Sequence, residues 1–455
     1  MPLPPRTRPP RGVVRVLVAG GAGALLLAGV PGVAAADGGR VLDVGRGGEF
    51  ATIQAAVDRA RSGDTVRIAP GEYREAVCVA GKALTVRGAG VGATTIAWPG
   101  WDDPAELPAL TPAQRRQPCW AAQQRLDGED GGGDDSTLAD DVSGLFFLDP
   151  GGPVRVSGLT TRDHPAGGIV ARGADGFLVT GTAASGHDRH GVAAHGSTGV
   201  RISGTTVTGR DRGTPSRPDT GAAGIVVAGS AAAAARVSGN AVEGLEVGVL
   251  VREARGVRVA GNTLSGNCAG LVVLDDAATG VPGGPDVPAG DVRVTGNFVT
   301  GNDRWCPRGP AGDRSLSGVG VQVVDADAVT VAGNVVADNT AGPPPGAPSP
   351  GAPAGGLALL SRPAAQVGQG GAGPVEDVRV EGNYFGDNVA LVPAGAPSAA
   401  GPAAARGAAL QMDVVVGDSS FPPLLDPGPG LAFVGNRCDA GLPAGVCGAP
   451  YPATP

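Results

Sequence analysis

Lysine and aromatic residues are scarce in this sequence. Lys82 is the single lysine, and aromatic residues make up 3% of the 455 residues. So few rings argue against a long aromatic binding platform. The formal net charge of -8 argues against nucleic acid or an anionic membrane as a general partner, because both are polyanions.

Long hydrophobic runs are also lacking, apart from one near the start of the chain. The arginines between Arg6 and Arg15 precede the apolar stretch 16–30, and Ala34-Ala35-Ala36 follows it. This order is typical of a signal peptide over residues 1–36. No second segment is long and apolar enough to span a membrane, and no cysteine lies at the expected cleavage point. The sequence therefore predicts secretion without membrane insertion.

Cysteine is limited to six residues, and an exported chain is expected to pair them. Cys438 and Cys447 are close in sequence, which predicts one disulfide. Cys268 and Cys306 follow the same repeat position in successive coils, which predicts a second. Elimination leaves Cys78 with Cys119.

Glycine and proline are abundant, with 80 and 41 residues, yet apolar residues reach 42% and recur in short runs. Residues 154–176 and 177–199 align without a gap at a period of 23. The opening apolar-x-apolar-x-Gly returns at Val200, Ala235, Val257, Val292, Val329 and Val378, and more loosely near Leu431. Each repeat predicts a short alternating strand, a Gly-Asn or Gly-Thr turn and a second strand. No helix-length periodic stretch separates the repeats, so the fold is expected to be a β solenoid.

Asparagine recurs in two columns. The first holds Asn262, Asn297, Asn334 and Asn383, and each is followed five residues later by Asn267, Asn302, Asn339 or Asn388. Parallel strands of successive coils lie about 4.8 Å apart, so an amide at one turn position can bond to the same amide above and below. These columns predict structural ladders.

The start of the chain carries a resemblance to known proteins. Phe50 to Val57 predicts a helix capped by Thr52, and 63–73 predicts a strand and turn. The run ATIQAAVDRARSGDTVRIAPGEYRE resembles the N-terminal cap of pectin-lyase-like β-helix proteins, including pectinesterases and the NosD-type group. The later coils resemble secreted β-helix repeat proteins of actinobacteria, and the resemblance covers most of 41–447. It implies an all-β fold, a right-handed parallel β-helix solenoid with an N-terminal capping helix.

The resemblance does not fix an activity, because this fold carries lyases, hydrolases, esterases and epimerases. The QDTL-type and DFIFG-type runs of pectinesterases are absent, as is the DPHD-type run of alginate epimerases. The expected organisation is a signal peptide at 1–36, a cap with the first coils at 37–97, an irregular insertion at 98–144, and coils with a disulfide-clipped end at 145–455.

Chemistry-bearing residues concentrate in two adjacent coils, which hold all four histidines. The alignment places His164 over His187 and then Arg210. In a groove, arginine could bind a uronate carboxylate while histidine removes the C5 proton. The candidate catalytic residues are His164, His187, Asp188, His190 and Arg210, and the candidate substrate-binding residues are Arg189, Asp211, Arg212, Trp101 and Trp120.

Two alternatives apply to the same cluster. His164, His187, Asp188 and His190 have the chemistry of metal ligands, but they lack a tight spacing motif. His164, His187 and Arg210 also fall in the second asparagine column, which makes them structural substitutes in the ladder. The insertions 212–223, 303–316, 340–354 and 392–406 all follow this column, and they are expected to wall one corner of the solenoid.

The insertion 98–144 contains Trp98, Trp101 and Trp120, which either stack on sugar rings or form a small core beside Cys119. Its acidic residues between Asp127 and Asp141 are candidate calcium ligands, although they do not fit the EF-hand pattern.

The leading hypothesis is a secreted, monomeric protein that engages polysaccharide as a uronate-polymer lyase or epimerase. The alternatives are a non-catalytic envelope or matrix-binding protein and, third, a NosD-like metal-associated protein.

Overall fold

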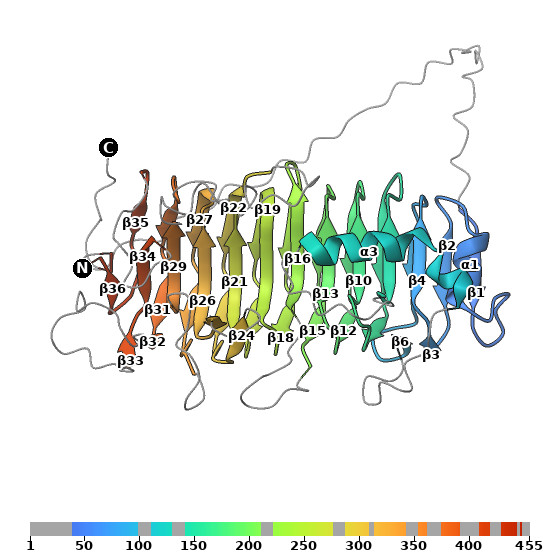
Figure 1. Ribbon diagram of the computed structural model, residues 1–455, viewed down its shortest axis with the longest axis horizontal. Helices are drawn as coiled ribbons and strands as arrows, with labels where there is room; N and C mark the ends of the chain where they lie inside the picture. The colour runs from blue at the N-terminus through green and yellow to red at the C-terminus, as the bar shows by residue number, and fades with distance from the viewer. Residues whose placement is uncertain are drawn as a thin grey trace, which may run out of the picture. The chain divides into compact units, whose positions relative to one another are not determined.

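Three long parallel sheets, which the chain visits in turn along most of the solenoid, form the fold of residues 39 onward (Figure 1). The computed structural model describes residues 39–98, 111–129, 142–210, 222–275, 287–308, 314–342, 354–361, 375–391, 409–418, 429–443 and 446–447. We call the sheets A, B and C in the order in which the chain visits them. The predicted parallel β-helix is confirmed. The prediction of two strands per coil was wrong, because the three residues between the asparagine columns form the third strand.

Sheet A contains β1 (Val41–Val44), β2 (Thr65–Ile68), β5 (Thr85–Arg87), β8 (Val154–Ser157), β11 (Phe177–Thr180), β14 (Arg201–Ser203), β17 (Ala235–Ser238), the second part of β19 (Val247–Ala260), β22 (Gly290–Thr295), β27 (Asp327–Ala332), β30 (Arg379–Glu381) and β35 (Ala432–Val434). Sheet B contains β3 (Gly71–Arg74), β6 (Thr94–Ala97), β9 (Thr160–Arg162), β12 (Ala183–Ser185), β15 (Thr206–Thr208), β18 (Ala241–Glu243), β20 (Thr263–Ser265), β23 (Phe298–Thr300), β28 (Val335–Ala337) and β31 (Tyr384–Gly386).

Sheet C contains β4 (Val77–Ala80), β7 (Leu145–Leu148), β10 (Ile169–Arg172), β13 (His190–His195), β16 (Ala223–Ser230), the first part of β19, β21 (Ala269–Leu274), β26 (Val319–Val324), β29 (Gly355–Ser361), β34 (Val414–Asp418) and β36 (Gly441–Leu442). Two antiparallel pairs project from the coils: β24 (Cys306–Arg308) with β25 (Arg314–Leu316), and β32 (Val389–Leu391) with β33 (Ala409–Gln411).

The repeated opening of each coil is a strand of sheet A with apolar side chains on its inner face. Val154 and Val156 are buried inside the coil, whereas Arg155 between them is exposed. This alternation recurs through sheet A, since successive strand residues point to opposite faces. Branched aliphatic side chains from all three sheets meet in one continuous interior core.

The asparagine columns lie at the two corners that flank sheet B, and both are buried ladders. At the corner between sheets A and B, Asn262 Nδ2 donates to Asn297 Oδ1 at 2.9 Å, and the Asn262 backbone N donates to the same oxygen at 3.0 Å. Asn302 and Asn339 form the same pair of bonds at the corner between sheets B and C, at 2.8 and 3.1 Å. The predicted ladders are confirmed.

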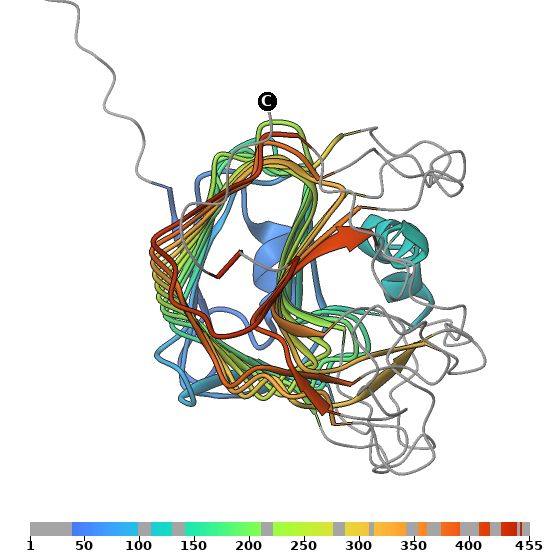
Figure 2. The same ribbon diagram turned by 90° about the vertical axis from the view of Figure 1, so that its left-hand side faces the viewer.

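Helix α1 (Ile53–Arg59) lies across the N-terminal end of the coil, as Figure 2 shows. Thr52 Oγ1 accepts from the Ala55 backbone N at 3.2 Å, as the sequence predicted. The Glu75 carboxylate accepts from the backbone N of Ile53 and of Gln54 at 2.9 and 3.0 Å. Burial raises the pKa of Glu75. The helix buries its apolar face over the interior core, so it serves as the expected cap.

The insertion between the cap and the regular coils is partly helical, which the sequence did not predict. It contains α2 (Pro112–Arg115) and α3 (Pro118–Glu129), and Thr111 forms a capping box with Gln114. Helix α3 packs outside the coil against β4 and β7 (Figure 2), where the Cys78–Cys119 disulfide holds it. Helix α3 covers the outer face of β4 and β7, and a second buried apolar cluster runs along the outer face of sheet C.

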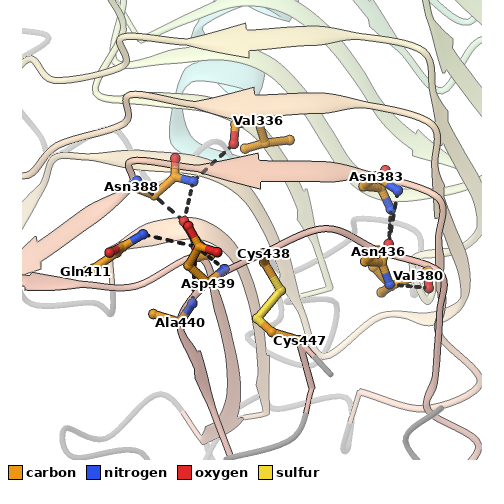
Figure 3. Close-up of a disulfide and its surroundings, with 11 residues drawn as sticks. Val336, Val380, Asn383, Asn388, Gln411, Asn436, Cys438, Asp439, Ala440 and Cys447 are labelled. Atoms are coloured by element: carbon orange, nitrogen blue, oxygen red, sulfur yellow. Dashed lines mark hydrogen bonds between the residues drawn. A yellow bond between two sulfur atoms is a disulfide. The ribbon is translucent and has the colours of Figure 1, made fainter. Parts of the chain in front are cut away.

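All three predicted disulfides form: Cys78–Cys119, Cys268–Cys306 and Cys438–Cys447. Such pairing is typical of proteins that fold in an oxidising compartment. The Cys438–Cys447 bridge lies beside the C-terminal ends of both ladders, where Asn383 Nδ2 donates to Asn436 Oδ1 (Figure 3).

Replacing Cys438 and Cys447 together with serine is expected to loosen this end by about 2 to 3 kcal/mol, because the bridge restricts a short loop in the unfolded chain. The measurement is amide hydrogen exchange. Protection of the Asn383 and Asn436 amides should fall while that of Ala56 in α1 stays the same. Unchanged protection at Asn383 would show that the bridge does not stabilise the last coil.

Candidate functional site

The four histidines separate into two pairs on opposite sides of the coil wall. His164 and His187 lie at the corner between sheets B and C, where later coils carry the second asparagine ladder. Strand register places His190 opposite Ala223 and His195 opposite Ala228, and both alanines belong to the apolar cluster outside sheet C. The four histidines that the sequence places in two adjacent coils therefore occupy two different environments.

The inner pair reproduces the hydrogen bonding of the asparagine ladder. The His164 backbone N donates to His187 Nδ1 at 3.1 Å, just as the Asn302 backbone N donates to Asn339 Oδ1. His187 Nε2 lies 3.1 Å from Thr161 Oγ1, and because Nδ1 is an acceptor, the neutral tautomer donates from Nε2. Both ring nitrogens of His187 are occupied by structural bonds.

His164 is fully buried, and its Nε2 donates to the carbonyl O of Glu75 at 3.0 Å. Burial lowers the pKa of His164 to about 4. Burial, followed by the charge of His164, also lowers the pKa of His187 well below its usual value. Both rings are therefore neutral at pH 7, and this arrangement supports the interpretation of His164 and His187 as ladder substitutes.

Glycine makes room for these ladder side chains at the start of sheet C. A Cβ on Gly168 would lie 2.7 Å from His187 Nε2, and a Cβ on Gly270 would lie 3.0 Å from Asn302 Nδ2. The same position is glycine in coil after coil, so each corner side chain fits under a strand without a Cβ.

The outer pair lies on sheet C at the ends of β13. The ring centroids of His190 and His195 are 6.0 Å apart, and the two residues are 4% and 6% exposed. Arg172, on the preceding coil, is in register with His195. On the following coil Ala228 takes this position, and Arg252 is in register with Ala228 one coil further. Arg252 lies 3.9 Å from Glu253, measured from Nε to Oε1. These groups form a basic cluster on a largely apolar face.

The turn that carries His190 is fixed by an ion pair and by backbone bonds. Asp188 pairs with Arg210 through Oδ1 and Nη2. The Asp188 backbone N donates to the His164 O at 3.2 Å, and the Arg189 backbone N donates to the Ala166 O at 3.0 Å. Arg210 thus contacts Asp188 rather than continuing the ladder, because that position in the next coil is occupied by Leu245, whose N donates to Asn267 Oδ1.

The sequence profile of a family described as "Right handed beta helix region" matches residues 144–389, more than half of the chain. The chain belongs to this family. No protein of curated function matches the sequence.

Solved structures with similar coils include enzymes that act on polysaccharides. The A-module of the mannuronan C-5 epimerase AlgE4 from Azotobacter vinelandii is 14% identical, with a TM-score of 0.42, over 83% of this chain and 85% of that one. The catalytic domain of a GH87 alpha-1,3-glucanase is 11% identical, with a TM-score of 0.42, over 90% and 71%. An alginate lyase from Paenibacillus sp. FPU-7 is 13% identical, with a TM-score of 0.32, over 77% and 97%. At these values the likeness concerns the coiled architecture.

The tryptophans of this β-helix protein divide between the described and undescribed parts. Trp120 is 4% exposed in the cluster outside sheet C, and its Nε1 donates to Gln117 Oε1 at 3.0 Å. Trp98 is also buried, with its ring centroid 6.1 Å from that of His164. Burial of Trp120 favours the loop-core interpretation over sugar stacking, because neither ring face is open to a ligand.

Several predicted site residues cannot be placed. Trp101, Asp211 and Arg212 lie outside the described residues, as does most of the acidic stretch 127–141. Among the described residues, no three His, Cys, Asp or Glu side chains are grouped so as to hold a metal ion. No described helix has the length and apolar character of a membrane span.

Some polar and aromatic residues of this β-helix were missed from the sequence. Arg172 and Arg252 were overlooked because their place outside sheet C depends on strand register between coils. Phe298 and Tyr384 are 55% and 43% exposed on sheet B, with Val335 between them in the same outward column. Alternation within three-residue strands was too short a signal to identify them.

Proposed function

We propose that this β-helix protein is exported and engages an acidic polysaccharide on the outer face of sheet C, as a lyase or epimerase of uronate polymers. One observation carries the proposal. On a largely apolar sheet face, Arg172 and His195 are adjacent in register, Arg252 lies one coil beyond Ala228 in the same column, and the His190 ring lies 6.0 Å from that of His195.

The chemistry of the cluster suits proton removal next to a carboxylate. Arg172 is partly exposed and in register with His195, so a guanidinium and an imidazole face the same unit of a polymer lying along the coils. Arginine would hold the uronate carboxylate and stabilise the charge that develops on it. A neutral imidazole would take the C5 proton, and either expulsion of the leaving group or return of a proton to the other face would follow.

Asp188 and Arg210 have a supporting role in this proposal. Their ion pair, with an Asp188 side chain 19% exposed and an Arg210 side chain 9% exposed, fixes the turn just before His190. We assign them to positioning rather than to proton transfer. His164 and His187 are assigned to the ladder, since their ring nitrogens are buried and His187 uses both in hydrogen bonds.

Export rests on separate features. The stretch 1–36 has the order of a signal peptide, and three disulfides are typical of proteins that fold in an oxidising compartment.

A second candidate is a non-catalytic binding protein of the envelope or matrix. It is favoured by the small exposure of His190 and His195, 4% and 6%, because a base must reach its substrate. In this case the same face would hold polymer without turnover.

The test is turnover of polygalacturonate and alginate by residues 37–455, with and without calcium, followed by absorbance of unsaturated product and by the epimer ratio in NMR. We expect His195→Gln and His190→Gln to reduce the rate about 100-fold or more, the usual cost of losing a general base. His164→Asn should keep full activity, because asparagine suits the ladder.

Loss of activity in His164→Asn with full activity in both outer variants would contradict the assignment. Binding of the polymers by all proteins without any product would establish the second candidate.

A further inference from the structure

The outer face of sheet A carries a column of arginines that the site on sheet C does not use. Strand register places Arg201 opposite Arg236, Arg236 opposite Arg258, and Arg258 opposite Arg293. Four consecutive coils therefore present a guanidinium at the same outward position, about 4.8 Å apart along the stack. We call these four residues the arginine column.

Most of the arginine column has no counter-charge among the residues that the structure describes. Arg201, Arg236 and Arg258 are exposed and form no ion pair or side-chain hydrogen bond with any described residue. Arg293, at one end, pairs with Asp291 at 3.4 Å. The other three cations thus face solvent side by side in a protein whose net charge is -8.

The same sheet neutralises an arginine elsewhere. Arg67 on β2 forms two bonds to the Asp43 carboxylate on the adjacent strand, at 2.5 and 2.7 Å. Like charges opposite each other on neighbouring strands are unfavourable, so a run of them without acids is not explained by sheet stability. An anionic partner that bridges the coils would remove this repulsion.

The residues beside the arginine column add hydrogen-bonding groups. Two positions further along the strands, Ser203, Ser238 and Thr295 point outward next to Arg201, Arg236 and Arg293. Hydroxyl groups can donate to and accept from the hydroxyls of a sugar. A straight line of guanidinium groups flanked by hydroxyls is complementary to a chain with one carboxylate in each sugar unit.

We propose that the arginine column is a docking strip for an acidic polysaccharide whose carboxylates bind successive guanidinium groups along the coil axis. The strip is separate from the basic cluster on sheet C. It rests on the proposed function only in the class of polymer that it would bind. A single file of charges does not match the two-dimensional charge of a membrane. None of the described outward residues of sheet A is aromatic, so the face lacks the stacking rings of single-stranded nucleic-acid sites.

The test compares two triple variants of the full mature chain with equal charge change. One is Arg201→Gln/Arg236→Gln/Arg258→Gln. The control is Arg59→Gln/Arg61→Gln/Arg116→Gln, three exposed arginines in or beside helices α1 and α2. Binding to immobilised polygalacturonate is measured over a series of salt concentrations, with neutral galactan, polyphosphate and phosphatidylglycerol vesicles as comparison probes.

We expect the column variant to bind polygalacturonate about tenfold or more weakly at low salt, as three exposed ion pairs predict, with a flatter salt dependence. The control should stay within about twofold of the wild type, in the range of exposed charges that make no contact. Lysine at the same three positions should keep most of the binding, since the charge is retained.

Equal binding of polygalacturonate by the column variant and the wild type would overturn the docking strip. Equal or tighter binding of galactan, polyphosphate or vesicles by the wild type would overturn the polymer class. If binding depends on the arginines and no uronate polymer is turned over, the proposed function fails while the docking strip stands.

Discussion

Lowering the pH from 7 to 4 is expected to destabilise the protein by several kcal/mol through His164 and His187. Their pKa values are depressed in the folded state, so the folded protein binds fewer protons than the unfolded chain. Stability from these groups is then complete above pH 6.5 and is lost as the pH falls toward the folded value. For His164 the fall in pKa from 6.5 to about 4 corresponds to about 3 kcal/mol. His187 acts in the same direction.

Other groups titrate over the same interval, so the informative quantity is a difference between proteins. The matched variant is His164→Asn/His187→Asn, which extends the asparagine ladder by side chains that do not titrate. Urea unfolding at a series of pH values should show a steep loss below pH 6.5 in the wild type and a smaller one in the variant. Parallel curves for the two proteins would mean that the inner histidines do not remain neutral in the fold.

Asn302→Asp is expected to destabilise the protein by about 4 kcal/mol, because it buries a charge and replaces a hydrogen-bond donor by an oxygen that faces two acceptors. Asn302 is fully buried, and its Nδ2 donates to Leu264 O at 3.1 Å and to Asn339 Oδ1 at 2.8 Å. A carboxylate would place an oxygen against both acceptors. The exposed neighbour variant Asp303→Asn is the control and should change the unfolding free energy by less than about 0.5 kcal/mol.

The Asn302→Asp variant also has a pH signature. Its carboxyl pKa should be raised in the folded state, so the variant should recover part of its stability as the pH falls, when the protonated carboxyl can donate one hydrogen bond. Urea unfolding of Asn302→Asp against wild type at pH 7 and pH 4.5 measures this. A loss under 1 kcal/mol at pH 7 would indicate that the ladder contributes little.

An aspartate does end the same ladder naturally, which shows why position matters. Asp413 Oδ1 accepts from Asn388 Nδ2 at 3.0 Å, and its Oδ2 accepts from the Asp439 and Ala440 backbone N at 2.9 and 3.3 Å. At Asp413 the surrounding groups donate hydrogen bonds to both carboxylate oxygens. In a middle coil, one oxygen of an aspartate would instead face two hydrogen-bond acceptors. Figure 3 shows Asp439, Ala440 and Asn388 around this end.

The arginine column was visible in the sequence but was not recognised. Arg201, Arg236, Arg258 and Arg293 occupy the same place in the apolar-x-apolar opening of their repeats, and strand alternation alone puts that place outside. The column becomes apparent only when the same outward position is compared from one coil to the next. The basic cluster on sheet C was different, because Arg172 and His195 become neighbours only through strand register.

The sequence by itself determined the solenoid, its cap, its ladders and its cysteine pairs. These features follow from local patterns: apolar alternation, the Gly-Asn corner, and a capped helix with one apolar face. The same patterns placed His164 and His187 in the ladder column, which is where the structure has them.

Only the tertiary structure decided which side of the wall each polar residue faces and what it touches across coils. Ladder partners in the first asparagine column are separated by between 22 and 53 residues, because insertions of different length intervene. A corner residue can turn inward or outward with little change in local sequence. His187 and His190 are three residues apart in sequence. The ladder hydrogen bonds hold the His187 ring at the inner corner, whereas strand pairing in sheet C places the His190 ring on the outer face.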